Sequence, residues 1–184
     1  MAKKSLVLIA SLSLIFMLGC NFVNNIASQA FAPSQTPPAK VVVSTDGRSQ
    51  LTLSGDWEVI NTLNKEAELQ VGNRKQQIYA IVITESKDDF TSFGKYADLC
   101  YSKFVETIDK IDVAGPTQLT INGKPAIQYK ISGAVKGINV VYLYTLVEGN
   151  KYFDQLILWT SHSKFETNEN TMQHVIESFQ EISK

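Results

Sequence analysis

The chain has 184 residues, which is room for one domain of ordinary size and an N-terminal leader. Its 17 basic and 18 acidic side chains give a net charge of -1, so it lacks the positive field on which nucleic-acid binding depends. Apolar residues make up 44% of the chain, which excludes a disordered protein. We therefore expect a globular domain that binds no nucleic acid.

The N-terminus has the pattern of a bacterial lipoprotein signal. Two lysines precede an uncharged apolar run that ends at Leu18 and is shorter than the roughly 20 residues that a membrane-spanning helix needs. The run closes with Met17-Leu18-Gly19-Cys20, which resembles the lipobox of bacterial lipoproteins. This resemblance implies that residues 1–19 are a signal peptide and that Cys20 carries a diacylglyceryl group, which would anchor the protein to a membrane.

Two alternatives to lipid attachment remain open. An uncleaved leader would itself be the anchor, although its apolar run is short for that purpose. Ala30-Phe31-Ala32 has the form of an ordinary signal-peptidase site, which would release a soluble protein, but it lies well beyond the apolar run and Pro33 follows it. Residues 20–40 are rich in Asn, Ser, Gln, Ala and Pro, a composition typical of a flexible tether.

The globular domain is predicted to span residues 41–184 and to begin with strands. Short segments rich in β-branched and aromatic residues are separated by Gly, Asn and Asp, which favour turns. Gly72-Asn73 is such a turn and should join the third and fourth strands in a hairpin. The predicted strands of this part are 50–53, 57–60, 67–71 and 77–84.

A helix is predicted next, with Ser92 as its N-cap because a serine hydroxyl can accept a hydrogen bond from a free amide of the first turn. Apolar residues recur at the three- and four-residue spacing of a single buried stripe. Cys100, the single thiol of the domain, lies on this stripe, so we expect it to be buried and unreactive. The stripe comprises Phe93, Tyr96, Ala97, Cys100, Phe104 and Ile108.

Two further hairpins and a second helix complete the prediction. Asn122-Gly123 separates strands 118–121 and 126–131, and residues 148–151 separate strands 138–147 and 152–159. The last helix is predicted at about 170–182. Its apolar face comprises Met172, Val175, Ile176 and Phe179. Because the central strands are apolar on both faces, helices should cover both sides of an antiparallel sheet, which gives an α+β fold.

The order of these motifs resembles the PsbP-like family, which includes photosystem II extrinsic proteins and bacterial lipoproteins of the DcrB and LpqN kind. The resemblance covers about residues 49–184. It is carried by Gly55-Asp56-Trp57, Asn122-Gly123-Lys124-Pro125-Ala126 and the terminal Ser178-Phe179. The proline that commonly precedes the tryptophan in this family is replaced here by Gly55 and Asp56. The resemblance implies no catalytic residues.

The sequence offers few side chains for catalysis or metal binding. His162 follows a strand and is predicted to be a turn residue, and His174 lies off the apolar stripe of the last helix, where we expect it to face solvent. Their spacing fits no usual zinc site. The acidic pairs Asp88-Asp89 and Asp109/Asp112 lack EF-hand spacing, so weak calcium binding is conceivable but not predicted. We expect no enzyme activity, catalytic residue, cofactor or bound metal.

The remaining candidate is an aromatic group on two neighbouring strands. It comprises Tyr142, Tyr144, Tyr152 and Phe153, which either pack in the core or line a ligand cleft. Two functions follow. The first is an accessory lipoprotein, tethered through lipid on Cys20 to the outer side of a membrane, that binds a membrane-protein complex; the family resemblance suggests photosystem II if the source is cyanobacterial. The second is an envelope lipoprotein that binds a small ligand or lipid between helix and sheet.

Overall fold

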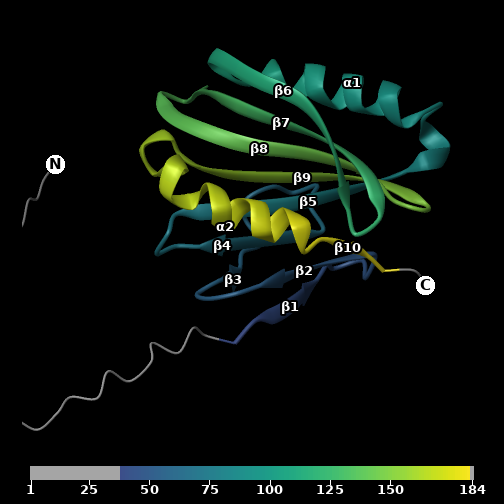
Figure 1. Ribbon diagram of the computed structural model, residues 1–184, viewed down its shortest axis with the longest axis horizontal. Helices are drawn as coiled ribbons and strands as arrows, with labels where there is room; N and C mark the ends of the chain where they lie inside the picture. The colour runs from purple at the N-terminus through teal and green to yellow at the C-terminus, as the bar shows by residue number, and fades with distance from the viewer. Residues whose placement is uncertain (1–37, 183–184) are drawn as a thin grey trace, which may run out of the picture. The chain divides into compact units, whose positions relative to one another are not determined.

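The computed structural model describes residues 38–182 (Figure 1). Seven strands form an antiparallel sheet in the order β3-β4-β5-β9-β8-β7-β6. Its strands are β3 (Glu58–Val59), β4 (Leu69–Asn73), β5 (Ile78–Ser86), β6 (Asp109–Ile121), β7 (Lys124–Val135), β8 (Ile138–Glu148) and β9 (Tyr152–Ser161). The predicted antiparallel α+β class is therefore confirmed.

Tight turns set the register of the long strands. Asn122 and Gly123 both have positive φ, at 47° and 79°, and join β6 to β7 at the predicted place. Lys136 and Gly137 form a second such turn between β7 and β8, at a position where no hairpin was predicted. The antiparallel pairing of β9 with both β5 and β8 aligns the side chains of these three strands in rows across the sheet.

Helix α1 (Phe93–Val105) begins where its sequence predicted. The Ser92 hydroxyl oxygen accepts a hydrogen bond from the Lys95 amide at 3.3 Å. Its aromatic side chains stack on one face of the sheet: Tyr96 on Phe153 with ring centroids 4.6 Å apart, and Phe104 on Tyr144 at 4.4 Å. A short 3-10 helix, η1 (Lys87–Asp89), joins β5 to this region.

Helix α2 (Phe165–Glu177) is shifted from its predicted range of about 170–182. It starts earlier because Phe165 is already buried in the core, after the 3-10 helix η2 (His162–Lys164). It ends earlier because the Ser178 hydroxyl donates to the Val175 carbonyl and the Asn122 amide donates to the carbonyls of Glu177 and Phe179. The predicted apolar face, Met172, Val175, Ile176 and Phe179, is buried.

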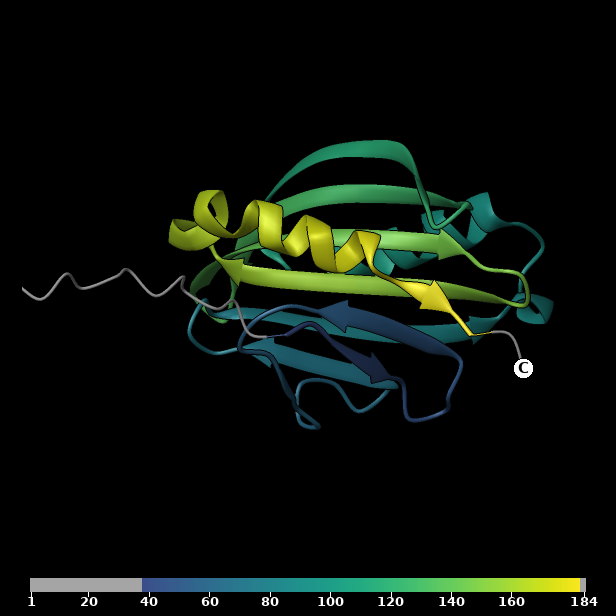
Figure 2. The ribbon, with the colours of Figure 1, turned by 60° about the horizontal axis from the view of Figure 1, so that its bottom comes forward.

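A second, smaller sheet has three strands, and the last of them comes directly after α2. Its order is β1-β2-β10, with β1 (Lys40–Val43), β2 (Ser49–Leu53) and β10 (Gln180–Glu181), and all pairs are antiparallel. The segment predicted as the end of the last helix is thus a strand that crosses to β2 (Figure 2). The strand predicted at 50–53 lies in this small sheet and not in the large one.

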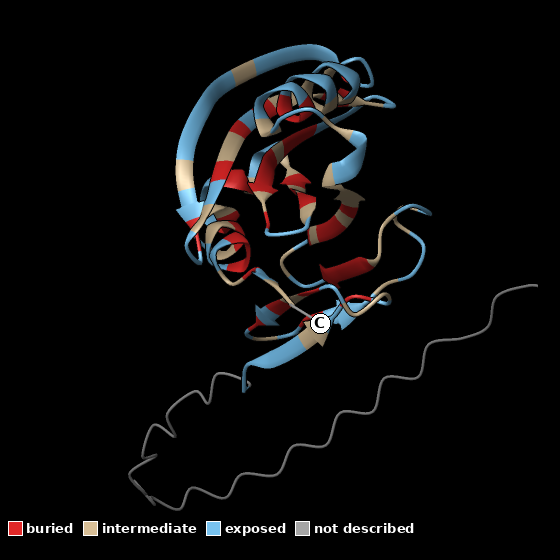
Figure 3. Cartoon of the chain, turned by 90° about the vertical axis from the view of Figure 1, so that its right-hand side faces the viewer, coloured by how far each residue is buried: buried red, intermediate tan, exposed pale blue. Residues whose placement is uncertain are grey.

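The large sheet separates two apolar cores. Helix α2 and β2 pack on one face, against residues such as Val82, Leu156 and Leu158. Helix α1 packs on the other, against Tyr144 and Phe153. Figure 3 shows these buried segments between the layers and β6 as a mostly exposed outer strand. Helices therefore cover both faces, as predicted.

No helix within residues 38–182 combines the length and the apolar character required to cross a bilayer. The leader at 1–19, Cys20 and nearly all of the tether at 20–40 lie outside the described residues, so their predicted roles stay predictions. Contacts group the described residues, 38–182, into one compact unit.

Candidate ligand-binding site

A cavity of about 490 Å³ lies between α1 and the large sheet. Its floor comes from β5, β8 and β9, one wall from α1, and the other from the loop before β4. Most of its lining is apolar, and four of the side chains are aromatic. The apolar lining comprises Leu63, Ile81, Ile83, Phe90, Leu99, Phe104, Tyr142, Ile157 and Trp159.

The cavity exists because α1 covers only part of this face. Its aromatic residues stack on rings of β7, β8 and β9, as Tyr101 does on Tyr129 with centroids 4.4 Å apart. The next strand, β5, therefore presents Ile81 and Ile83 to the cavity. A helix displaced to one side of a sheet leaves a groove along the uncovered strands.

The opposite wall is held in place by one buried amide side chain. The Gln70 Oε1 accepts hydrogen bonds from the backbone amides of Leu63 and Asn64, at 2.9 and 3.0 Å. Its Nε2 donates to the carbonyls of Asn64 and Ala67, at 2.7 and 3.2 Å. Because Gln70 itself lies on β4, these four bonds fix the loop against the sheet and keep the cavity open. The sequence does not indicate a role for Gln70, because only the fold brings its hydrogen-bond partners together.

A chain of polar side chains lies at one end of the cavity. Glu85 Oε2 accepts hydrogen bonds from the Tyr96 hydroxyl at 2.8 Å and from the Gln155 amide at 2.9 Å. Gln155 Oε1 in turn accepts from the Tyr144 hydroxyl at 2.6 Å. Glu85 and Gln155 line the cavity, so a carboxylate and an amide oriented by two phenols face any ligand there.

Burial disfavours the charged form of the phenols at this site. It raises the pKa of the Tyr96 hydroxyl, chiefly by desolvation, and it raises the pKa values of Tyr144 and Tyr142 for the same reason. These phenols are therefore neutral near pH 7. Lys103 of α1 is exposed at the rim. The site thus combines an apolar body with a polar, hydrogen-bonding end.

Cys100 lies on the predicted stripe of α1 but is half-buried, where full burial was expected. The reason is the cavity itself, which leaves the thiol without a covering strand on one side. Burial still raises the pKa of the Cys100 thiol, which disfavours the nucleophilic thiolate.

The predicted aromatic group divides between core and site. Tyr144 and Phe153 are buried in the core, and Tyr142 lines the cavity. Tyr152 lies elsewhere, with the Arg48 guanidinium 4.6 Å above its ring. The cleft and core interpretations were therefore each right for part of the group.

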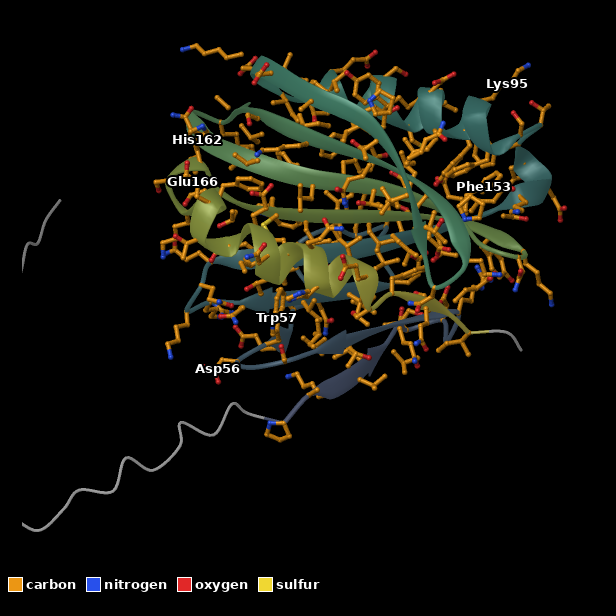
Figure 4. All side chains as sticks on the ribbon, in the orientation of Figure 1. Asp56, Trp57, Lys95, Phe153, His162 and Glu166 are labelled. Carbon is orange, nitrogen blue, oxygen red and sulfur yellow. The ribbon has the colours of Figure 1, made fainter. Side chains whose placement is uncertain are left out.

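The remaining candidate residues lie apart from the cavity. His162 is exposed in η2 and His174 is exposed on α2, as predicted, and Figure 4 shows His162 at the opposite end of the sheet from Phe153. The acidic pairs, Asp88-Asp89 and Asp109/Asp112, are exposed. Among residues 38–182, no three His, Cys, Asp or Glu side chains gather in a way that would hold a metal ion.

The fold is the Mog1p/PsbP-like fold. CyanoP from Synechocystis sp. PCC 6803 superposes with a TM-score of 0.55 at 9% identity, over 78% of this chain and 92% of that chain. LpqN of Mycobacterium tuberculosis, described as involved in cell envelope biogenesis, gives 0.56 at 13% identity, over 78% and 90%. The Ran-binding protein Mog1p of Saccharomyces cerevisiae gives 0.53 at 11% identity, over 80% and 97%.

No protein-family model matches the sequence, and a comparison with curated protein sequences finds no significant match. At these identities the likeness is one of fold, and it carries no activity or partner to this chain.

Proposed function

We propose that this protein is a non-enzymatic binding lipoprotein, anchored through Cys20 to the outer side of a membrane, whose cavity under α1 takes a small amphipathic ligand. The cavity is the observation that carries the proposal. Its volume of about 490 Å³ falls in the range of roughly 300–1,000 Å³ that is usual for ligand sites. A groove of this volume lined by aromatic side chains suits a small ligand, whereas a protein partner is usually bound by a broad exposed apolar patch.

The polar end of the site indicates how the ligand is oriented. Glu85 can only accept hydrogen bonds when ionised, so a ligand group that donates, such as a hydroxyl, suits this end. The apolar remainder of the ligand would lie against Ile81, Ile83 and Ile157. Such a molecule is available at a membrane surface, where the lipid on Cys20 would hold the domain.

Only the fold supports an accessory role at a membrane complex. In a cyanobacterial source, the partner in that role would be photosystem II. The fold is shared by proteins whose names describe different roles, including Ran binding, so it does not favour that partner. The ligand-binding role has the geometry of the cavity in addition to the fold.

A charge at the mouth of the cavity should weaken binding. Trp159 lines the cavity and Trp57 is buried in the other core, so Trp57→Phe leaves one fluorescent reporter at the site. In residues 35–184 with this change, decanol should shift the Trp159 emission in a saturable manner. Leu99→Glu should weaken decanol binding by about tenfold, because apolar contact at the rim is replaced by a charge that must stay hydrated.

The matched control is Val59→Glu, which places the same charge on another exposed apolar residue outside the cavity. It should leave the affinity for decanol unchanged. Equal weakening by both substitutions, or no saturable response in the parent protein, would contradict the proposed site.

A further inference from the structure

A second cavity of about 360 Å³ adjoins the first on the same face of the sheet. Tyr142 and Trp159 line both cavities, so the two spaces meet at this pair of rings. The centroids of the two rings are 6.2 Å apart, and Tyr79 stacks on Trp159 at 5.6 Å. The junction is therefore an aromatic row that crosses three neighbouring strands, β5, β9 and β8.

The strand register shows how the spaces are aligned. Tyr79 pairs with Trp159, and Trp159 pairs with Tyr142; the next row inward pairs Ile81 with Ile157. Both rows run along one face of β5 and β9, so the floor is continuous from Gln155 to Ser161. Six residue steps of a strand, at about 3.3 Å each, give this floor a length of about 20 Å.

We propose that the two cavities form one trough that holds a single extended acyl chain, with its polar end at Glu85 and its tail beside Ile138. This inference rests on the proposed ligand-binding function and names the ligand class. Half of a hydrocarbon core of about 30 Å is about 15 Å, so a membrane acyl chain and a small head group match a floor of about 20 Å.

The far end of the trough presents apolar surface to a tail, and Gln77, Lys136, Thr160 and Ser161 also line it. Val135, Val140 and Ile138 contribute to the apolar lining, and Ile138 is 64% exposed, the most exposed of the large apolar residues in the described chain. Its side chain stays in water unless a ligand covers it. The hydrogen-bonded group that could hold a polar head group lies at the other end of the trough. It consists of Glu85, Gln155 and Tyr96.

The test measures how affinity depends on chain length. Residues 35–184 form a compact unit and can be used alone, with Trp57→Phe leaving Trp159 as the reporter. Octanol, decanol, dodecanol and tetradecanol are titrated in turn. Each added methylene that enters the trough should raise the affinity by about fourfold, and the gain should continue past decanol because the second cavity accepts the tail.

Two matched variants locate the tail. Ile138→Asp should lower the affinity for tetradecanol by at least about tenfold and leave octanol binding unchanged, because only the longer chain reaches this residue. Ile111→Asp makes the same change at an exposed isoleucine on β6, outside both cavities, and should alter neither affinity.

The outcomes separate the two proposals. If octanol binds and the affinity does not rise beyond decanol, the trough is wrong and the proposed binding function stands. If no alcohol binds, both are wrong. If sedimentation shows a dimer whose formation Ile138→Asp abolishes, this face is an interface between two copies, which also overturns the trough.

Discussion

Replacement of Asp154 by asparagine should raise the free energy of unfolding, relative to the wild type, by about 4 kcal/mol more at roughly pH 8 than at roughly pH 4. Asp154 is 1% exposed, and burial, followed by the nearby carboxylates of Glu181, Glu68 and Asp46, raises its pKa from 3.8 to about 7. One oxygen accepts a hydrogen bond from the Thr84 hydroxyl at 2.7 Å, and Oδ2 is buried without a partner in the described chain.

The direction follows from comparing the folded and unfolded states. The folded state holds the Asp154 proton more tightly, so its stability is highest below the unfolded pKa of 3.8 and falls as the pH rises through about 7. Asparagine carries no charge at any pH and removes this loss. Glu68 also has a pKa raised mainly by burial, so a smaller pH dependence in the same direction should remain in the variant.

Urea denaturation of residues 35–184 at several pH values checks this expectation. Asp112→Asn, which changes an exposed aspartate on β6, serves as the control and should leave the pH profile as it is. The same pH dependence of stability in the wild type and in Asp154→Asn would contradict the raised pKa of Asp154.

Substitution of Cys20 by serine should abolish lipid attachment, because the thioether to diacylglycerol requires the cysteine sulfur. In cells supplied with radiolabelled palmitate, label in the wild-type protein should fall to background in Cys20→Ser, and the precursor should accumulate unprocessed. Cys100→Ser is the matched control, since it removes the other cysteine and should keep the label. Undiminished labelling of the Cys20 variant would contradict the lipoprotein assignment.

Local signals predicted most of the strands and the first helix. Asn122-Gly123 and Ser92 act through neighbouring residues, so a hairpin and a helix start could be located without knowing the fold. The end of α2 could not, because Asn122, far away in the sequence, caps its last carbonyls. Gln180 and Glu181 likewise become a strand only because β2 lies beside them.

The site was less predictable than the fold for a related reason. A cavity is a place where side chains fail to meet, and its size depends on how far α1 is displaced across the sheet. Periodicity put Cys100 on the buried side of α1 but could not show that a cavity beside the helix would leave the thiol half-buried. In the sequence, Gln70 has no feature that distinguishes it from other strand residues. In the structure, four hydrogen bonds made by its side chain position the wall of the cavity.

Cys100 offers the most direct test of ligand binding, since it is the single thiol of residues 35–184 and lines the cavity. Its modification by N-ethylmaleimide should be slow in the folded protein because burial raises the thiol pKa. Decanol at roughly ten times its dissociation constant should slow that reaction by about tenfold and leave the rate in urea unchanged. An equal rate of modification with and without saturating decanol would mean that the cavity is not where the ligand binds.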